Sequence, residues 1–290
     1  MGAVLAALLL YEGETMAFSK ATIIKIVVLL LSIYIGICIG VAVMQERFLY
    51  HPNPIKSDIV IAQQTIPTLR EVHYPSETSS NYAFYAPAQK GNKIVVFLHG
   101  NSYHLNTFLG RVKPFVDKGY GVLMPEYTGF GGIEGDIRQS HLERDVSQAI
   151  DFLKTQGYSS KDIILYGYSL GTYLAVYTAS ETDVPFYAVV LEAPFTSLVD
   201  VAFVTVHYLL PVGLLMKDGY FSIDRIKNIR SPLFIAHGKK DTVVPYEFGY
   251  RLFLDAETSK TFFSVDKATH RNLPEYGLFN AVWDWLQSLS

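Results

Sequence analysis

The fold of this chain is decided by residues 162–171, which read DIILYGYSLG. The apolar run at its start is typical of a buried strand, and the stretch after Gly171 suits a buried helix. Gly167, Ser169 and Gly171 form a Gly-x-Ser-x-Gly motif at the junction. In so sharp a turn, a side chain at either glycine position would collide with the neighbouring strand and helix. The stretch therefore predicts a serine exposed on a tight strand-to-helix turn.

Predicted strands and helices alternate on both sides of this turn, which is typical of an α/β fold with a mostly parallel central sheet and helices on both faces. The sequence predicts strands at 93–98, 120–126, 187–192, 231–236 and 261–265, and helices at 105–118, 142–156 and 276–289. Earlier in the chain, prolines interrupt three shorter predicted strands, as expected at an antiparallel edge. These three lie at 59–63, 68–74 and 82–86.

Composition limits the classes of function. The chain has 290 residues, of which 50% are hydrophobic, so it can form one large α/β domain, predicted over residues 46–290. A net charge of −3 without a basic stripe argues against a nucleic-acid partner. Its one cysteine, Cys38, allows no intramolecular disulfide. The eight histidines show no metal-site spacing, so we expect neither a metal nor a cofactor.

An uncharged apolar segment occupies residues 26–44. As a helix it crosses about 30 Å of hydrocarbon. We predict a transmembrane signal anchor at 22–45 behind an N-terminal tail at 1–21, with Met16 as an alternative start. A cleaved signal peptide and a buried soluble helix are the alternatives. Lys20 and Lys25 before the segment nearly balance Arg47 and Lys56 after it, and we favour a catalytic domain on the extracytoplasmic side.

A serine hydroxyl needs a base to remove its proton and a carboxylate to orient that base. Residues 237–245 read HGKKDTVVP and residues 266–272 read DKATHRN, each directly after a predicted strand. Asp241 and His270 therefore lie at the carboxyl edge of the sheet, where ligand chemistry gathers in open α/β folds. We predict Ser169 as the nucleophile, His270 as the base and Asp241 as the acid. Asp266 and Glu192 remain alternative acids.

The negative charge that develops on the attacked carbonyl needs two N–H donors. Leu170, in the first turn of the helix after Ser169, offers one such N–H group. The second is expected from the loop after the strand ending at Leu98, where we choose Asn101 and keep Ser102 as the competitor. His99 and His237 each precede a glycine at a strand end, so we interpret them as structural.

Between residues 195 and 230 the alternation breaks, and two apolar stretches interrupted by Pro211 and Gly213 follow each other. They are interpreted either as a pair of packing helices or as a lid that supplies an acyl-binding wall, which we favour. An apolar lid favours apolar substrates. His207 in this region is expected to pack or to lie at its rim.

Four motifs together resemble the α/β-hydrolase superfamily: HGN at 99–101, GYSLG at 167–171, HGKKDTVVP at 237–245, and His270. The sequence FLYHP at 48–52 and the apolar segment before it are similar to the membrane-anchored α/β-hydrolase-domain-containing proteins. The resemblance spans 48–289 and implies a Ser–Asp–His hydrolase of esters, thioesters or amides. Residues 127–133 read YTGFGGI, without the arginine and serine that relatives often carry there.

The sequence thus predicts a membrane-anchored serine hydrolase that cleaves an ester or thioester of an apolar acyl substrate, either a small molecule or a lipid. A serine peptidase or amidase of the same fold is the first alternative. A catalytically silent, membrane-tethered binding protein is the second. The sequence leaves the oligomeric state open.

Overall fold

The computed structural model describes residues 19–75, 80–206 and 209–289. Most of the predicted N-terminal tail, with Met16, and His207 of the predicted lid lie outside these residues. The chain forms two compact units that meet in the sequence between Met44 and Gln45. The second unit contains every predicted site residue.

The first unit contains most of one long helix, α2 (Lys20–Leu49). An 18-residue window of α2 has a mean hydropathy of 2.9, and 6% of that window is buried. By length and composition this helix is long and apolar enough to cross a membrane. It extends four residues beyond the predicted anchor, and its last turn, from Gln45, belongs to the second unit.

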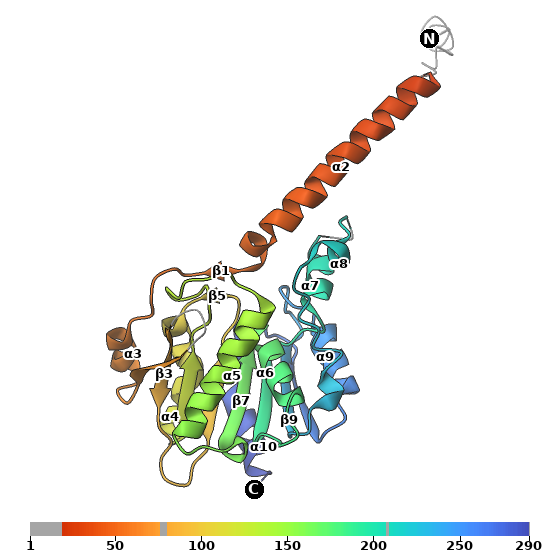
Figure 1. Ribbon diagram of the computed structural model, residues 1–290. Helices are drawn as coiled ribbons and strands as arrows, with labels where there is room; N and C mark the ends of the chain where they lie inside the picture. Colours follow the sequence, from red (N-terminus) through yellow and green to blue (C-terminus); the bar gives the residue numbers. More distant parts are fainter. Residues whose placement is uncertain (1–18, 76–79, 207–208, 290) are drawn as a thin grey trace, which may run out of the picture. The chain divides into compact units, whose positions relative to one another are not determined.

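Within the described residues, the second unit is built on an eight-stranded sheet of order β10-β9-β8-β7-β4-β6-β3-β2. Figure 1 labels three of its strands, β3, β7 and β9. Strand β3 pairs antiparallel with both β2 and β6, and every other neighbouring pair in this sheet is parallel. The strands are β2 (Arg70–Pro75), β3 (Ser80–Ala86), β4 (Ile94–Leu98), β6 (Gly121–Pro125), β7 (Ile163–Tyr168), β8 (Ala188–Glu192), β9 (Leu233–Gly238) and β10 (Lys260–Val265). A separate parallel pair joins β1 (His51–Pro52) to β5 (Ser102–Tyr103).

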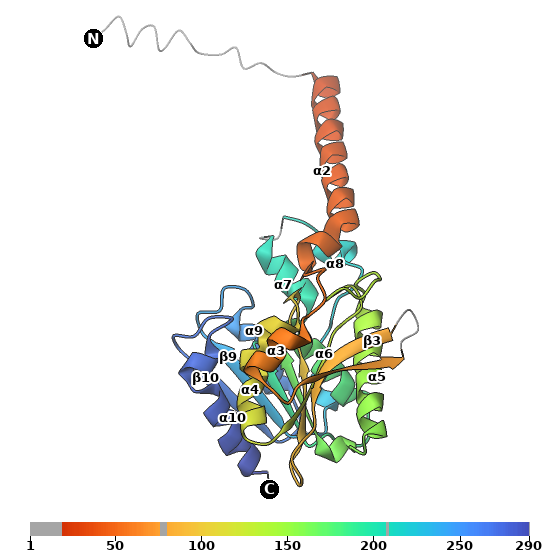
Figure 2. The same cartoon turned by 90° about the vertical axis from the view of Figure 1, so that its left-hand side faces the viewer.

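Helices cover both faces of the sheet (Figure 2). Helices α5 and α6 contribute to the core on one face, and α3, α4 and α10 to the core on the other. The helices of this unit are α3 (Ile59–Thr65), α4 (Leu109–Asp117), α5 (Gln139–Thr155), α6 (Leu170–Ser180), α7 (Leu198–Thr205), α8 (Val212–Leu215), α9 (Tyr246–Asp255) and α10 (Leu278–Gln287).

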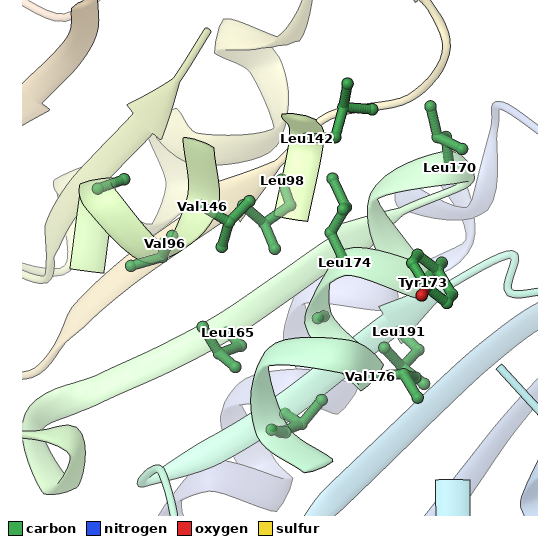
Figure 3. Close-up of a cluster of buried hydrophobic side chains, with 14 of the residues drawn as sticks. Val96, Leu98, Leu142, Val146, Leu165, Leu170, Tyr173, Leu174, Val176 and Leu191 are labelled. Carbon is green, nitrogen blue, oxygen red and sulfur yellow. The ribbon is translucent and has the colours of Figure 1, made fainter. Parts of the chain in front are cut away.

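The apolar strands are buried because successive side chains enter opposite cores. In β4, Val96 and Leu98 pack under α5 and α6, as Figure 3 shows, whereas Val95 and Phe97 pack on the other side. Each fully buried aliphatic side chain of this kind stabilises the fold by about 1.5–3 kcal/mol. The predicted α/β architecture with a mostly parallel sheet is confirmed.

One predicted strand is wrong, because residues 59–63 form helix α3. The Asp58 carboxylate caps this helix by accepting hydrogen bonds from the N–H groups of Val60 (2.7 Å) and Ile61 (3.3 Å). Ala62 and Ile66, four residues apart, are buried, while Val60 and Ile61 are exposed. The helical spacing of the buried residues and the cap thus outweigh the β-branched character of the run.

Candidate active site

Ser169 lies on the strained turn between β7 and α6 that the motif predicts. Its backbone angles are φ 52° and ψ −118°, a conformation that residues other than glycine rarely adopt. A Cβ atom on Gly171 would collide with the carbonyl oxygen of Leu98, and one on Gly167 with that of Gly171. The requirement for both glycines is therefore confirmed, and the turn holds the serine at the carboxyl edge of the sheet.

The structure brings Ser169, His270 and Asp241 into one chain of contacts. His270 Nε2 lies 3.0 Å from Ser169 Oγ, and His270 Nδ1 lies 2.8 Å from Asp241 Oδ2. A carboxylate can only accept, so Nδ1–H donates to Asp241 and the bare Nε2 accepts from the Ser169 hydroxyl. All three residues are nearly buried, with exposed fractions of 9%, 6% and 9%. This geometry allows His270 to act as a base towards Ser169.

The Asp241 carboxylate is fixed by its own loop. Its Oδ1 accepts hydrogen bonds from the N–H groups of Val243 and Val244, both at 2.8 Å. Burial alone raises the pKa of Asp241, but contacts with His237 and His270 and the bond from Val244 outweigh it. The net effect holds the pKa of Asp241 well below its ordinary value, so the carboxylate is ionised when it faces the imidazole.

The two alternative acids are engaged elsewhere. Both carboxyl oxygens of Glu192 accept from Arg111, each at 3.0 Å, and one also accepts from Tyr166 at 2.8 Å. Asp266 forms a 2.8 Å ion pair with Lys239, and its side chain is 80% exposed. Neither carboxylate occupies the position beside His270 that Asp241 holds.

Arg111, on α4, is a site residue that the sequence analysis missed. Besides pairing with Glu192, its Nη2 donates to the carbonyl oxygen of Arg271 (3.1 Å), the residue after His270. Its guanidinium also lies 4.0 Å from the centre of the Tyr168 ring, which is next to Ser169. Burial lowers the pKa of Arg111, but the Glu192 carboxylate outweighs this effect and raises it above its ordinary value. Arg111 therefore stays charged and ties the serine turn to the histidine loop.

The predicted N–H donors, Leu170 and Asn101, both line the small cavity at Ser169. Leu170 is the first residue of α6, where an N–H group has no partner within the helix. Asn101 follows β4 and lines the space around Ser169. The alternative, Ser102, lies one residue further on, and its hydroxyl donates to the Asn101 side chain at 3.1 Å. The roles of these residues in holding an oxyanion stay a prediction.

Two cavities of different character meet at Ser169. The larger, of about 230 Å³, includes Arg111, Tyr168, His270 and Arg271 among its lining residues. The smaller, of about 60 Å³, has a mainly apolar lining that includes Leu49, Tyr50, Leu170, Phe195, Leu198 and Val201. Leu198 and Val201 belong to α7, in the region predicted as a lid. A substrate bound at Ser169 can thus place one part in the larger, more polar cleft and another in the smaller, mainly apolar cavity.

The two histidines interpreted as structural are fully buried. His99 Nδ1 donates to the carbonyl oxygen of Gly100 (2.8 Å), and its Nε2 lies 3.0 Å from Glu126 Oε1. His237 Nε2 donates to the carbonyl oxygen of Val244 (3.0 Å) and lies 3.3 Å from Asp241 Oδ2. Across the part of the chain that the structure describes, no group of three or more histidine, cysteine, aspartate and glutamate residues is arranged to hold a metal ion.

Comparisons with known proteins agree with this fold. A family model described as serine aminopeptidase, S33, matches residues 89–212. Human protein ABHD12B is 32% identical over 185 residues, and the match covers 58% of this chain and 51% of that protein. An uncharacterized protein of Mycobacterium tuberculosis is 29% identical over 269 residues, or 90% of this chain and 92% of that protein. This chain thus spans about half the length of the human relative.

Solved structures show the same fold at low sequence identity. An esterase from Pyrococcus furiosus superposes with a TM-score of 0.64 at 20% identity, covering 83% of this chain and 97% of that structure. The fold and the serine turn are those of the α/β-hydrolase fold. The family model and the human relative support the resemblance to the α/β-hydrolase-domain-containing proteins that the motifs predict.

Proposed function

We propose that this protein is a serine hydrolase that cleaves carboxylic ester or thioester bonds of apolar acyl substrates. The observation that supports the proposal most directly is the contact chain from Ser169 through His270 to Asp241, at 3.0 and 2.8 Å. In this arrangement the carboxylate orients the imidazole, and the imidazole can activate the serine as a nucleophile.

In the first half of the reaction, Ser169 Oγ attacks the acyl carbonyl while His270 Nε2 takes the hydroxyl proton. Asp241 holds the imidazole in the tautomer that accepts this proton and stabilises the imidazolium that results. The N–H groups of Leu170 and Asn101 hold the negative oxygen of the tetrahedral intermediate. His270 then donates its proton to the leaving alcohol or thiol, which departs and leaves an acyl-enzyme on Ser169.

In the second half, water takes the place of the leaving group. His270 removes a proton from the water as it attacks the acyl carbonyl, and the same two N–H groups hold the oxyanion. Collapse of the intermediate breaks the bond to Ser169 Oγ, which recovers its proton from His270. The products are a carboxylic acid and the free enzyme, and no step requires a cofactor.

The two cavities beside Ser169 support an apolar acyl group. An acyl chain fits the smaller cavity, whose wall includes Phe195, Leu198 and Val201. The leaving group then occupies the larger and more polar cleft, which Arg271 lines. Burial of apolar surface in the smaller cavity supplies binding energy for the acyl part of a small molecule or a lipid.

Helix α2 anchors the protein in a membrane, with the catalytic unit on the extracytoplasmic side. The support for the anchor is its mean hydropathy of 2.9 over 18 residues. Lys20 and Lys25 precede the apolar segment, as expected of an N-terminus that stays inside the cell. Because Arg47 and Lys56 follow it, the side of the membrane needs a direct measurement.

Fluorophosphonate labelling of cells that produce the full chain tests both parts of the proposal. A membrane-permeant probe is expected to label Ser169, since such probes react with activated serines. A membrane-impermeant probe is expected to label it equally well in intact and in permeabilised cells. Ser169→Ala is expected to abolish labelling and to lower p-nitrophenyl ester turnover on the order of 10⁶-fold.

The two arms of this experiment fail separately. If the permeant probe left the wild type unlabelled, or if Ser169→Ala kept full ester turnover, the serine-hydrolase assignment would be wrong. If the impermeant probe labelled only permeabilised cells, the orientation alone would be reversed. Thr172→Ser, in the same helix, serves as a control for expression. The Thr172 hydroxyl donates to the backbone carbonyl oxygen of Ser169 (2.6 Å), and a serine at this position keeps that hydroxyl.

A serine peptidase is the second candidate, because the matching family model is described as a serine aminopeptidase. The same nucleophile would then attack an amide, and His270 would protonate a leaving amine. Parallel assays of p-nitrophenyl esters and aminoacyl p-nitroanilides separate the two functions. The esterase proposal expects the higher Ser169-dependent kcat/KM with the esters.

A further inference from the structure

The segment from Gln45 to Asn53, which we call the connecting segment, follows the apolar part of α2 and contacts the loop that carries Asn101. The Asn101 side-chain amide donates to the carbonyl oxygen of Leu49 (2.6 Å). The N–H of His51 in turn donates to the carbonyl oxygen of Asn101 (2.9 Å). The connecting segment and the Asn101 loop therefore hold each other from both directions.

A parallel strand pair extends this contact. His51 pairs with Ser102 and Pro52 with Tyr103, and the N–H of Asn53 donates to the carbonyl oxygen of Tyr103 at 3.2 Å. Tyr103 has a φ of 72°, which a non-glycine residue keeps only where its surroundings enforce it. The connecting segment is thus part of what fixes the loop after β4 in its strained shape.

The connecting segment is also fixed to the region predicted as a lid. The buried hydroxyls of Tyr50 and Tyr220 lie 2.7 Å apart. The Gln45 side chain donates to the carbonyl oxygen of Leu215 (3.1 Å) and accepts from the N–H of Lys217 (2.9 Å). These contacts, together with those to Asn101, give the backbone at Leu49 a defined place beside Ser169.

In this position, Leu49 lines the small apolar cavity. Its side chain is half-buried, and it shares the cavity wall with Leu170, Phe195, Leu198 and Val201. The cavity measures about 60 Å³, so each wall residue controls a large share of the space open to an acyl chain. Phe48, the preceding residue, is 60% exposed and is absent from this wall.

We infer that Leu49 sets the length of acyl chain that the enzyme accepts, so that the connecting segment is a functional part of the active site. The inference rests on the proposed acyl-hydrolase function and adds a specificity residue to it. A shorter side chain at position 49 opens the cavity to longer acyl chains, and a longer side chain closes it. Packed apolar walls respond in this way because the neighbouring side chains fill removed volume only in part.

The test compares p-nitrophenyl butyrate with p-nitrophenyl octanoate, using the full chain in detergent micelles. Leu49→Ala is expected to raise the octanoate-to-butyrate ratio of kcat/KM about ten-fold, a factor that one or two methylene groups supply in an apolar pocket. Leu49→Phe is expected to lower that ratio. Phe48→Ala, the matched control, is expected to keep the wild-type ratio.

The outcomes separate this inference from the function on which it rests. If turnover depends on Ser169 but Leu49→Ala and Leu49→Phe keep the ratio of Phe48→Ala, Leu49 does not set chain length. If the wild type shows no Ser169-dependent turnover of either ester, the proposed function fails, and this inference fails with it. Fluorophosphonate labelling checks the fold of each variant. If Leu49→Ala remains unlabelled, Leu49→Val and Leu49→Phe replace it in the test. Leu49→Val is then expected to raise the octanoate-to-butyrate ratio of kcat/KM, and Leu49→Phe is expected to lower it.

Discussion

Two buried pairs of histidine and carboxylate lie at the same edge of the sheet, yet their surroundings differ. His270 and Asp241 follow β10 and β9, and His99 and Glu126 follow β4 and β6. The first pair is 6% and 9% exposed, whereas the second is fully buried. The second ring nitrogen of His270 faces the Ser169 hydroxyl, but that of His99 donates to the carbonyl oxygen of Gly100.

The comparison shows that residue types alone do not make a catalytic pair. His99 has its second nitrogen occupied by backbone and its ring stacked on Tyr127, with ring centres 4.0 Å apart. The pair with Glu126 therefore joins the loops after β4 and β6 and supports the base of the site. His270 instead has the Ser169 hydroxyl in contact and an open cleft beside it. The proposed catalytic pair thus differs from the structural pair in its access to a cleft and a hydroxyl group, and not in its residue types.

The largest expected difference between the pairs is catalytic. Asp241→Asn is expected to lower kcat for p-nitrophenyl butyrate by about 10⁴-fold, because the amide favours the wrong imidazole tautomer. KM is expected to change little, since Asp241 faces His270 rather than the substrate. Steady-state kinetics on the full chain measure both values. A loss of ten-fold or less would mean that another carboxylate orients His270.

The second pair is expected to matter for stability. Glu126→Ala removes the carboxylate that lies 3.0 Å from His99 Nε2 and 3.4 Å from the Ser57 hydroxyl. The free energy of unfolding is expected to fall by about 1–3 kcal/mol, because buried polar groups lose a partner. Urea unfolding followed by circular dichroism measures this change. When kcat is calculated per fluorophosphonate-labelled site, it is expected to equal that of the wild type. A large loss of kcat per labelled site would assign the His99 pair to the catalytic machinery.

The smallest expected effect is a change of stability with pH. The pKa of Asp241 is lowered in the folded protein, so its ionised form stabilises the fold above the unfolded pKa of about 3.9. That contribution is lost as the pH falls from this value towards the lower folded pKa. The unfolding free energy of the wild type minus that of Asp241→Asn is therefore expected to decrease as the pH falls below about 4.

Urea titrations of both proteins at several pH values measure this difference. Ser169→Ala is the matched control, since it removes a site residue without removing a charge. A difference that stayed constant or increased below about pH 4 would contradict a lowered pKa at Asp241.

Much of the fold was predictable because its signals are local. The apolar runs of β4, β7, β8 and β9 are buried on both faces, so each reads as a strand without knowledge of its neighbours. The turn at Ser169 needs Gly167 and Gly171 for steric reasons that the motif itself contains. Helix α3 was missed because its evidence is the cap at Asp58 and the burial of Ala62, which compete with a β-branched run.

The candidate site likewise contains residues that local sequence predicts and one residue that it does not. Ser169, Asp241 and His270 were chosen from the sequence because each follows a strand whose carboxyl end meets the same sheet edge, and the structure brings them within hydrogen-bond distance. Their chemical roles stay a prediction. Arg111 was missed because nothing near it in the sequence suggests that it contacts Glu192 and the loop after His270.

The sequence by itself determined most of the strands, the serine turn and an apolar N-terminal helix, since each depends on residues that are neighbours in the chain. Tertiary structure alone decided which of the candidate carboxylates faces His270, which histidines are fully buried, and that Leu49 lies beside Ser169. Those properties arise between residues as far apart as Leu49 and Asn101 or Arg111 and Glu192. Residues so far apart in the chain come into contact only when the folded sheet brings their loops together, so the sequence pattern around each residue does not predict the contact.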